Sequence, residues 1–408
     1  MSLLRSPQLQ CEFWNVGQGL FSSGRIQMGD APSFHWVYDC GTNSSPKLIQ
    51  NAVQKYNQQE NNADIDLLVL SHFDKDHISG VKELLKNGRK IKRWVVPYYP
   101  LWQRLVIASL LEIQPDDEEW AFYQNPIQYF KTYFAKELKI TKFLVLPAKE
   151  NEGEISINLE PSNYDDVLSF ETTGKLSNEF DNLEQSVHWL NPNKALLFRK
   201  GEEQFEFVLY NVPFHLLAKV PTNLTAFQKQ VEQIIQSHQS NSTDPTPALK
   251  TLYTLTFGNG SKHKNIISQY LYIRNIKLSS FWGMGNNHIF DVSIGNENEI
   301  AVIPKDKTKN AILYTGDAFL NDLPLLTDLT QSLGVERMAR IYCLQVPHHG
   351  SKHNWQQGLA NIFSPCLSVF SADSQRRNGH PHGEVLKDFA TYTPILVNKN
   401  KRLSIHSI

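Results

Sequence analysis

The sequence is short of cysteine and has no long apolar run. Its four cysteines are scattered through 408 residues with no CxxC pair: Cys11, Cys40, Cys343 and Cys366. This spacing argues against a thiolate zinc site and against a disulfide-stabilised scaffold. No stretch approaches the roughly 20 apolar residues that a membrane span needs, and the first residues lack an apolar core of signal-peptide length. We therefore expect a soluble, cytoplasmic protein without a membrane span.

An excess of charge of either sign is also missing. The 40 Lys and Arg residues nearly balance the 41 Asp and Glu residues, and the formal net charge is −1. Without a basic surplus the chain has no overall attraction for nucleic acid. A site for a polyanion must then be local or built from metal ions. Hydrophobic residues make up 41% of the chain and charged residues 20%, which is typical of a globular protein with a sizeable core.

The sequence does contain a repeated pattern, in which a short apolar, β-rich run ends in a polar residue of metal-ligand type. The runs FHWVY, IDLLVLS, NAILYTG and IYCLQVP lead to Asp39, His72, Asp317 and the pair His348-His349. Such runs predict buried strands, and loops at one edge of a sheet are where a rigid scaffold holds a site. Helical spacing between the strands predicts α/β layers.

The middle of the chain, residues 97–255, is less regular. We predict amphipathic helices over 100–113 and 126–138, a β-hairpin over 195–212, and a polar, Pro-containing loop over 237–250. Ligand-type residues lie on both sides of this segment. We therefore interpret the whole chain, from 1 to 408, as one domain into which a large, partly helical segment is inserted.

The stretch SHFDKDHISG carries the strongest signal for chemistry. Within six residues it places His72, Asp74, Asp76 and His77. Imidazole and carboxylate groups together suit hard to borderline divalent metals. The alternating pair His72 and Asp74 can face one ion, and the next pair a second ion. A carboxylate that reaches both ions completes a two-metal site with a spacing of about 3.5–4 Å. The plainer alternative for Asp76 is an N-cap, which Asp favours.

Together these motifs resemble the metallo-β-lactamase superfamily, through Asp39 in YDCG and through SHFDKDHISG, YTGDAF and VPHHGS. More narrowly, the sequence is similar to the soluble metallo-β-lactamase-like domain of bacterial competence and DNA-uptake proteins, in which VGQG, HHGS and GHP occur together. Here these are NVGQGL (15–20), VPHHGS and NGHPHGEVL (378–386). The resemblance covers roughly residues 10–96 and 295–408. It implies an α/β fold, an αββα sandwich with two metals between the sheets.

The resemblance also implies a role for each matching residue. The implied roles are His72 and Asp74 on the first metal, Asp76 and His77 on the second with Asp76 also near the attacking hydroxide, Asp317 as a bridge, His349 or otherwise His348 on the second metal, Asp39 orienting the motif loop by hydrogen bonds, and His380 at the substrate phosphate or leaving group. Gly17 and Gly19 would let the backbone pass close to the site.

The sequence departs from the superfamily pattern in two places. Asp74 stands where HxHxDH has its middle histidine, and the extra carboxylate favours manganese or iron relative to zinc, with zinc still allowed. The usual histidine between the motif and the GD pair is not identifiable. His263 and His288 are candidates, although each has the pattern of an ordinary loop histidine.

We therefore expect a hydrolase that holds two divalent ions, Zn or Mn, and uses an activated hydroxide on a phosphodiester of DNA, RNA or a nucleotide. Asp76 and His380 are the expected catalytic residues. The same hydroxide could instead open a lactone, a thioester or a β-lactam, although the competence-type motifs favour the phosphodiester. A different class is a partner-gated or inactive module of a multi-protein bacterial system, in which the inserted segment would contact a protein partner.

Overall fold

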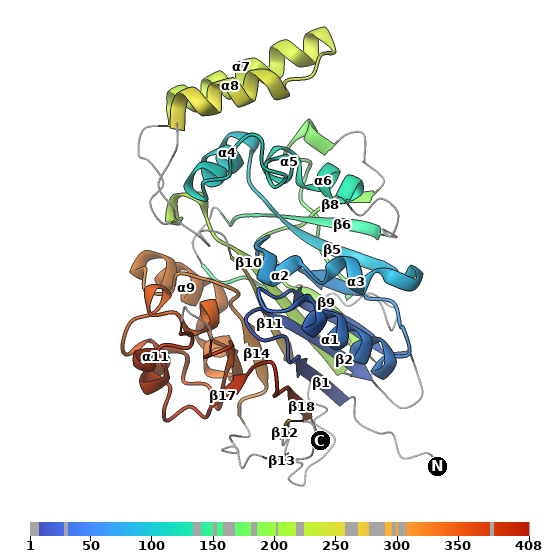
Figure 1. Ribbon diagram of the computed structural model, residues 1–408, viewed down its shortest axis with the longest axis vertical. Helices are drawn as coiled ribbons and strands as arrows, with labels where there is room; N and C mark the ends of the chain where they lie inside the picture. The colour runs from blue at the N-terminus through green and yellow to red at the C-terminus, as the bar shows by residue number, and fades with distance from the viewer. Residues whose placement is uncertain are drawn as a thin grey trace.

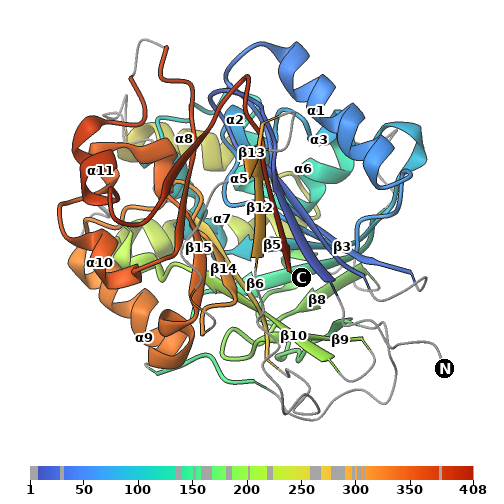
Figure 2. The same ribbon diagram turned by 90° about the horizontal axis from the view of Figure 1, so that it is seen from below.

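Two β-sheets face each other, and helices cover the outer face of each, as Figures 1 and 2 show for this computed structural model. The described residues are 8–27, 32–133, 140–149, 153–157, 168–180, 186–200, 203–217, 224–257, 268–276, 290–295, 299–300, 306, 308–375 and 379–407. This four-layer arrangement confirms the predicted αββα sandwich.

One sheet has ten strands and the other eight. The first runs in the order β13 (Glu299–Ile300), β12 (Phe290–Ile294), β18 (Leu403–Ser407), β1 (Gln8–Phe13), β2 (Phe21–Gln27), β3 (Phe34–Cys40), β4 (Leu67–Val69), β5 (Ile91–Tyr98), β6 (Ile140–Pro147) and β8 (Val187–Trp189). The second runs in the order β17 (Pro394–Val397), β16 (Leu367–Ser371), β15 (Ile341–Gln345), β14 (Ala311–Tyr314), β11 (Gln269–Asn275), β10 (Glu203–Asn211), β9 (Leu196–Lys200) and β7 (Leu168–Ser169).

The apolar runs in the sequence form these strands because the strands are covered on both faces. All seven residues of β3, all three of β4 and all five of β15 are buried. A strand between two covered faces gains from apolar side chains at every position, so alternation disappears. The inner faces meet in a core that includes Tyr38 and Tyr314, whose rings stack 4.6 Å apart across the two sheets. The four predicted strand runs are confirmed.

Most of the α-helices pack on the outer faces of the sheets. The α-helices are α1 (Pro46–Gln59), α2 (Lys75–Ile78), α3 (Val81–Leu84), α4 (Leu101–Leu110), α5 (Trp120–Gln124), α6 (Pro126–Tyr133), α7 (Thr225–Asn241), α8 (Thr246–Phe257), α9 (Leu323–Ala339), α10 (Leu359–Phe363) and α11 (Gly383–Asp388). In Figure 2, α1 and α3 lie on one side of the sandwich, while α9, α10 and α11 lie on the other. Short 3₁₀ turns include η3 (Phe214–Leu216) and η4 (Pro347–Gly350).

The segment 97–255 contributes strands to both sheets, namely β6 and β8 to one and β7, β9 and β10 to the other. Its helices gather at one end of the molecule, where α4, α5, α6 and the α7–α8 pair lie in Figure 1. The predicted hairpin is confirmed as β9 paired antiparallel with β10. Helices α4 and α6 confirm the two predicted amphipathic helices over the residues that the structure describes.

The predicted loop over 237–250 is wrong, because most of it is helical. Helix α7 continues to Asn241, and α8 begins at Thr246. The chain reverses direction within the few residues between the two helices. Ser242 takes a left-handed conformation (φ 51°), and the Asp244 carboxylate accepts a hydrogen bond from the Thr246 amide at 2.9 Å. Polar, Pro-containing sequence thus served as a helix stop followed by a helix start. Nowhere in the described ranges is there a helix long and apolar enough to cross a bilayer.

Candidate metal centre

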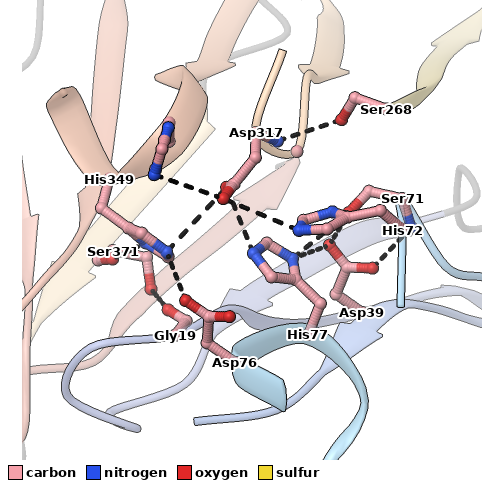
Figure 3. A network of polar contacts seen from close by, with 12 residues as sticks. Gly19, Asp39, Ser71, His72, Asp76, His77, Ser268, Asp317, His349 and Ser371 are labelled. Atoms are coloured by element: carbon pink, nitrogen blue, oxygen red, sulfur yellow. Dashed lines mark hydrogen bonds and ion pairs between the residues drawn. The ribbon is translucent and has the colours of Figure 1, made fainter. Parts of the chain in front are cut away.

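Four strand ends converge at one edge of the sandwich (Figure 3). Strand β4 runs parallel to β3 and β14 runs parallel to β15, so the carboxyl ends within each pair lie at the same edge. Asp39 lies at the end of β3, and His72 follows β4 after a short loop. Asp317 follows β14 in the other sheet, and the His348-His349 pair follows β15. Residues from distant parts of the sequence thus meet between the sheets.

The backbone is unusual where these side chains turn inward. Asp39, His348 and His349 all have positive φ angles, of 55°, 47° and 56°. Residues other than glycine rarely adopt this left-handed region, and such conformations cluster at functional sites. The two consecutive left-handed histidines bring both imidazoles to the same carboxylate. Gly19 allows the close approach that the sequence predicted, because a Cβ there would lie 2.9 Å from the Asp76 carbonyl oxygen.

The Asp317 carboxylate lies at the centre of four imidazoles, and each of its oxygens faces a different pair. Its Oδ1 lies 3.1 Å from His77 Nε2 and 3.9 Å from His349 Nε2. Its Oδ2 lies 3.7 Å from His72 Nε2 and 3.8 Å from His348 Nε2. Asp317 is almost completely buried, at 1% exposure. A carboxylate placed in this way is suited to bridging two cations.

A group of four buried residues meets the distance requirement for a shared metal ion. Ligand atoms of Asp76, His77, Asp317 and His349 all lie within 4.8 Å of one another. His349 Nε2 is also 3.2 Å from Asp76 Oδ2. The side chains of His72 and His348 face the other oxygen of the Asp317 carboxylate, Oδ2. The structure therefore brings together six of the seven residues that the sequence assigned to metal.

Each imidazole is oriented by a contact at its other ring nitrogen. The Nδ1 atoms lie 2.6–2.8 Å from an oxygen in every case, with the pairs His72–Ser71 Oγ, His77–Asp39 Oδ2, His348–Asn354 Oδ1 and His349–Ser371 O. Such contacts fix the ring orientation and raise the basicity of the free nitrogen, as they do for metal-binding histidines in general. All four Nε2 atoms consequently point at Asp317.

Asp39 is the most heavily used of these orienting groups. It accepts hydrogen bonds from the Ser71 amide at 2.6 Å and the Ser71 hydroxyl at 2.7 Å, and it contacts His77 Nδ1 at 2.7 Å. Asp39 therefore holds the start of the motif loop and one imidazole together. The arrangement agrees with the orienting role that the resemblance implied.

The charges of the site favour a bound cation. Burial and the neighbouring His77 lower the pKa of His72 to about 4, so that its ring is neutral at pH 7. Burial also opposes the His77 cation, but Asp317 and Asp39 outweigh it and raise the pKa of His77 well above its usual value. A proton on His77 thus compensates the buried carboxylates. Because a divalent ion can replace such a proton, metal binding here would release it.

A second observation also indicates that these residues are suited to a metal ion. The Nε2 atom of His72 is buried and makes no hydrogen bond within the described part of the chain, and that of His77 faces the Asp317 carboxylate at 3.1 Å. A buried polar atom normally has a hydrogen-bond partner, because leaving it without one is costly. Nitrogen and carboxylate oxygen donors together suit zinc and manganese. The donor set and its buried nitrogens therefore match the expected divalent ions.

The remaining predicted residues lie at the margin of this cluster. Asp74 caps the start of α2 by position and is half-buried, outside the four-residue group. The His380 ring lies 5.7 Å from that of His348 and is nearly parallel to it. Burial and the neighbouring His349 and His348 lower the pKa of His380 to about 4. His263 and His288, the candidates for the missing ligand, lie outside the described residues.

Three contributors were missed from the sequence. Ser71, Asn354 and Ser371 supply the oxygens that orient His72, His348 and His349. Ser71 could have been found, because it directly precedes the motif histidine. Nothing in the sequence marks the other two, since the contact of Ser371 comes from its backbone carbonyl and Asn354 lies in a separate turn.

Asp39→Asn should weaken metal binding by about 10- to 100-fold, since loss of an orienting carboxylate typically has this effect. The amide keeps the shape but cannot accept hydrogen bonds at both ends. The measurement is competition for Zn²⁺ or Mn²⁺ against a chelating dye. As a control, Ser371→Ala keeps the carbonyl that contacts His349 and should change the affinity little. Equal affinities for wild type and Asp39→Asn would show that Asp39 does not position the centre.

Residues 32–139 match the family model of the metallo-beta-lactamase superfamily. Among solved structures, the metallo-beta-lactamase fold protein YhfI from Bacillus subtilis matches with a TM-score of 0.34 and 9% identity over 98% of this chain and 100% of that one. A long form RNase Z from yeast matches with a TM-score of 0.29 and 9% identity over 97% of this chain and 41% of that one. No curated protein sequence matches.

The matched segment, residues 32–139, includes β3, β4 and the whole SHFDKDHISG motif. The other half of the centre comes from β14 and β15, far outside it. The structure as a whole is an αββα sandwich. Its ligand-type residues lie at the strand ends, between the two facing sheets. The chain has the metallo-β-lactamase fold.

Proposed function

We propose that this protein is a metal-dependent phosphodiesterase that holds two divalent ions. The observation that carries this proposal is the position of Asp317, whose two carboxylate oxygens face two different sets of imidazoles. The closer similarity to competence-type domains, through NVGQGL and NGHPHGEVL, supports a phosphodiester over a lactone, thioester or β-lactam substrate. It does not identify the polymer or nucleotide that is cleaved.

The geometry suggests which residues would hold each ion. Asp76, His77 and His349 would share one ion with Asp317 Oδ1. His72 and His348 would share the other with Asp317 Oδ2. The resemblance implied His348 only as a substitute for His349 at the second ion. The structure supports a different arrangement, in which His348 takes the position of the histidine that the sequence lacks.

Two divalent ions in such a site supply Lewis acidity, which neutralises charge on the phosphoryl oxygens and lowers the pKa of water. Asp76 is then placed to receive the proton of the attacking water, because its buried carboxylate faces the centre through Oδ2. The same carboxylate returns the proton to the leaving oxygen as the P–O bond breaks. Water and the phosphodiester are thus converted to a phosphomonoester and an alcohol.

His380 is placed to hold the phosphate. It is buried, and its Nδ1 atom has no hydrogen-bond partner among the residues that the structure describes. A neutral imidazole can donate one N–H hydrogen bond to a phosphoryl oxygen. With its pKa lowered to about 4, His380 carries almost no proton beyond that N–H at pH 7. We therefore assign it to orienting the phosphate rather than to donating a proton.

The test is hydrolysis of bis-(p-nitrophenyl) phosphate in Mn²⁺, Zn²⁺ and Mg²⁺, with Asp76→Ala and a chelator-treated sample as controls. We expect activity in at least one metal, lost on chelation, restored by adding the metal back, and lowered by about a hundredfold or more in Asp76→Ala. Two bound ions without hydrolysis would reject the phosphodiesterase and favour a lactone, thioester or β-lactam substrate. If the protein neither binds metal nor hydrolyses the substrate, the alternative of an inactive module in a multi-protein bacterial system would be favoured.

A further inference from the structure

Phe73 lies between His72 and Asp74, the two motif residues that the resemblance assigned to the first metal. It is a half-buried aromatic residue in a stretch, SHFDKDH, whose other members are all polar. Neither the metal centre nor the proposed reaction uses its side chain. The contacts of the Phe73 ring show what it does there.

The ring of Phe73 packs on helices of the inserted segment 97–255. Its centroid lies 3.6 Å from that of Phe122 in α5 and 5.4 Å from that of Phe130 in α6. Phe122 and Phe130 are buried, at 5% and 1% exposure. Contacts between aromatic rings stabilise a structure beyond the apolar area that they bury. The loop that leads from β4 to the metal centre is therefore attached to the inserted helices.

The rings beneath Phe73 are in turn fixed to the ten-stranded sheet. The Phe130 ring lies 4.2 Å from that of Trp94 in β5, the strand that pairs with β4. Trp94 is fully buried, at 0% exposure. Phe122 also contacts Phe130, with centroids 5.7 Å apart. Phe73 thus rests on two buried rings that Trp94 supports, next to the strand that leads to His72.

Hydrogen bonds hold the motif loop on either side of Phe73. Before it, the Gln269 amide donates to the Ser71 carbonyl at 2.8 Å. After it, amides in the first turn of α2 donate to the Asp74 carbonyl. Between these points, the backbone groups of His72 and Phe73 make no hydrogen bond to any residue that the structure describes. The aromatic contact is therefore the main anchor of the backbone at His72.

The two sides of the Asp317 carboxylate depend on this anchor to different degrees. His72 faces Oδ2 at 3.7 Å, and its backbone lies in the part of the loop that Phe73 anchors. The motif ligands on the Oδ1 side come from α2, which is also held from outside the motif, because the Asp76 carbonyl accepts a hydrogen bond from the Leu20 amide at 3.0 Å. Movement of the Phe73 ring would therefore displace His72 more than the ligands in α2.

We propose that Phe73 is a positioning residue, through which the inserted helices α5 and α6 set the geometry of the metal ion on the Oδ2 side of Asp317. The inference rests on the two-ion arrangement of the proposed function, and it gives the segment 97–255 a role at the metal centre. With the Phe73 ring held by α5 and α6, His72 stays directed at Oδ2. Without that contact the ion on this side is bound more weakly, while the ion on the Oδ1 side is retained.

The test is binding of Mn²⁺ to the full chain, measured by calorimetry and by electron paramagnetic resonance, which distinguishes a lone Mn²⁺ ion from a coupled pair. Phe73→Leu and Phe122→Leu keep much of the apolar volume and remove the ring contact from either side. Each should weaken the binding of one ion about tenfold or more and leave the other unchanged. At a Mn²⁺ concentration that fills both sites of the wild type, each variant should show the signal of a lone ion.

Two further variants separate positioning from general loss of packing. Phe73→Leu combined with Phe122→Leu should weaken the same ion no further than the stronger single variant, because residues in contact do not act additively. Phe290→Leu is the matched control, since its half-buried ring packs on Tyr342 with centroids 4.2 Å apart, in the part of the ten-stranded sheet beyond β1 and β2. It should bind both ions like wild type.

Binding of both ions at wild-type affinity in Phe73→Leu and Phe122→Leu would overturn the inference. Equal weakening of the two ions would also overturn it, because the loss would then be one of general packing. Failure of the proposed function is seen separately, as two bound ions in the wild type without hydrolysis of bis-(p-nitrophenyl) phosphate. Selective loss of one ion in Phe73→Leu without that hydrolysis would support the positioning role and reject the phosphodiesterase.

Discussion

Asp317→Asn is expected to abolish hydrolysis and to remove both metal ions. Among the described residues, Asp317 is the carboxylate that faces both pairs of imidazoles, and the neutral amide of the variant would leave the charges of two cations without their shared counter-ion. Metal ions supply several kcal/mol of transition-state stabilisation. A loss of about 4 kcal/mol corresponds to a rate about a thousandfold lower. The measurements are the hydrolysis rate and the metal content of the purified protein.

Two neighbouring variants show whether Asp317 bridges. His348→Ala should lose the ion on the Oδ2 side, where His348 lies 3.8 Å from Asp317, and keep the other. His349→Ala should lose the ion on the Oδ1 side, where His349 also faces Asp76. Each variant should therefore retain about one metal per chain. Two metals per chain in Asp317→Asn, or loss of neither ion in both histidine variants, would contradict a shared bridging carboxylate.

Most residues of the candidate metal centre could be placed near one another from the sequence because they follow strands. Apolar runs that end in Asp39, His72, Asp317 and His348-His349 predicted both the strands and their meeting at one edge. Which oxygen of the Asp317 carboxylate His348 faces could not be predicted from the sequence. It depends on two consecutive left-handed residues and on the Asn354 side chain, and both are properties of the folded chain. The resemblance did not identify a residue of this chain that takes the place of the missing histidine.

The middle of the chain was harder to interpret than its ends. Its hairpin and two of its helices were predicted, because their periodicity is strong. That β6 and β8 join one sheet while β7, β9 and β10 join the other was not, since strand pairing between distant segments leaves no local pattern. Polar residues were also taken for a loop where two helices are capped. Short polar stops within a helical hairpin look the same in sequence as a longer linker.

A buried ion-pair network shows the same limit of sequence reasoning. Glu206 in β10 accepts hydrogen bonds from Arg274 Nε at 2.8 Å and Arg337 Nε at 3.0 Å. The three residues come from β10, β11 and α9, so the network joins the eight-stranded sheet to the helix on its outer face. A glutamate within the apolar alternation of β10 gave no sign of two partners 68 and 131 residues away.

Glu206→Ala should lower the free energy of unfolding by about 3–5 kcal/mol, because it leaves two buried guanidinium groups without their shared carboxylate. This is a large share of the total stability of about 5–15 kcal/mol that is usual for a domain. Glu206 is fully buried, whereas Glu336, the other partner of Arg274, is 67% exposed. Glu336→Ala is therefore the matched control, with an expected loss below about 1 kcal/mol. The measurement is urea unfolding of each variant. Equal losses for the two would mean that burial does not set the strength of this network.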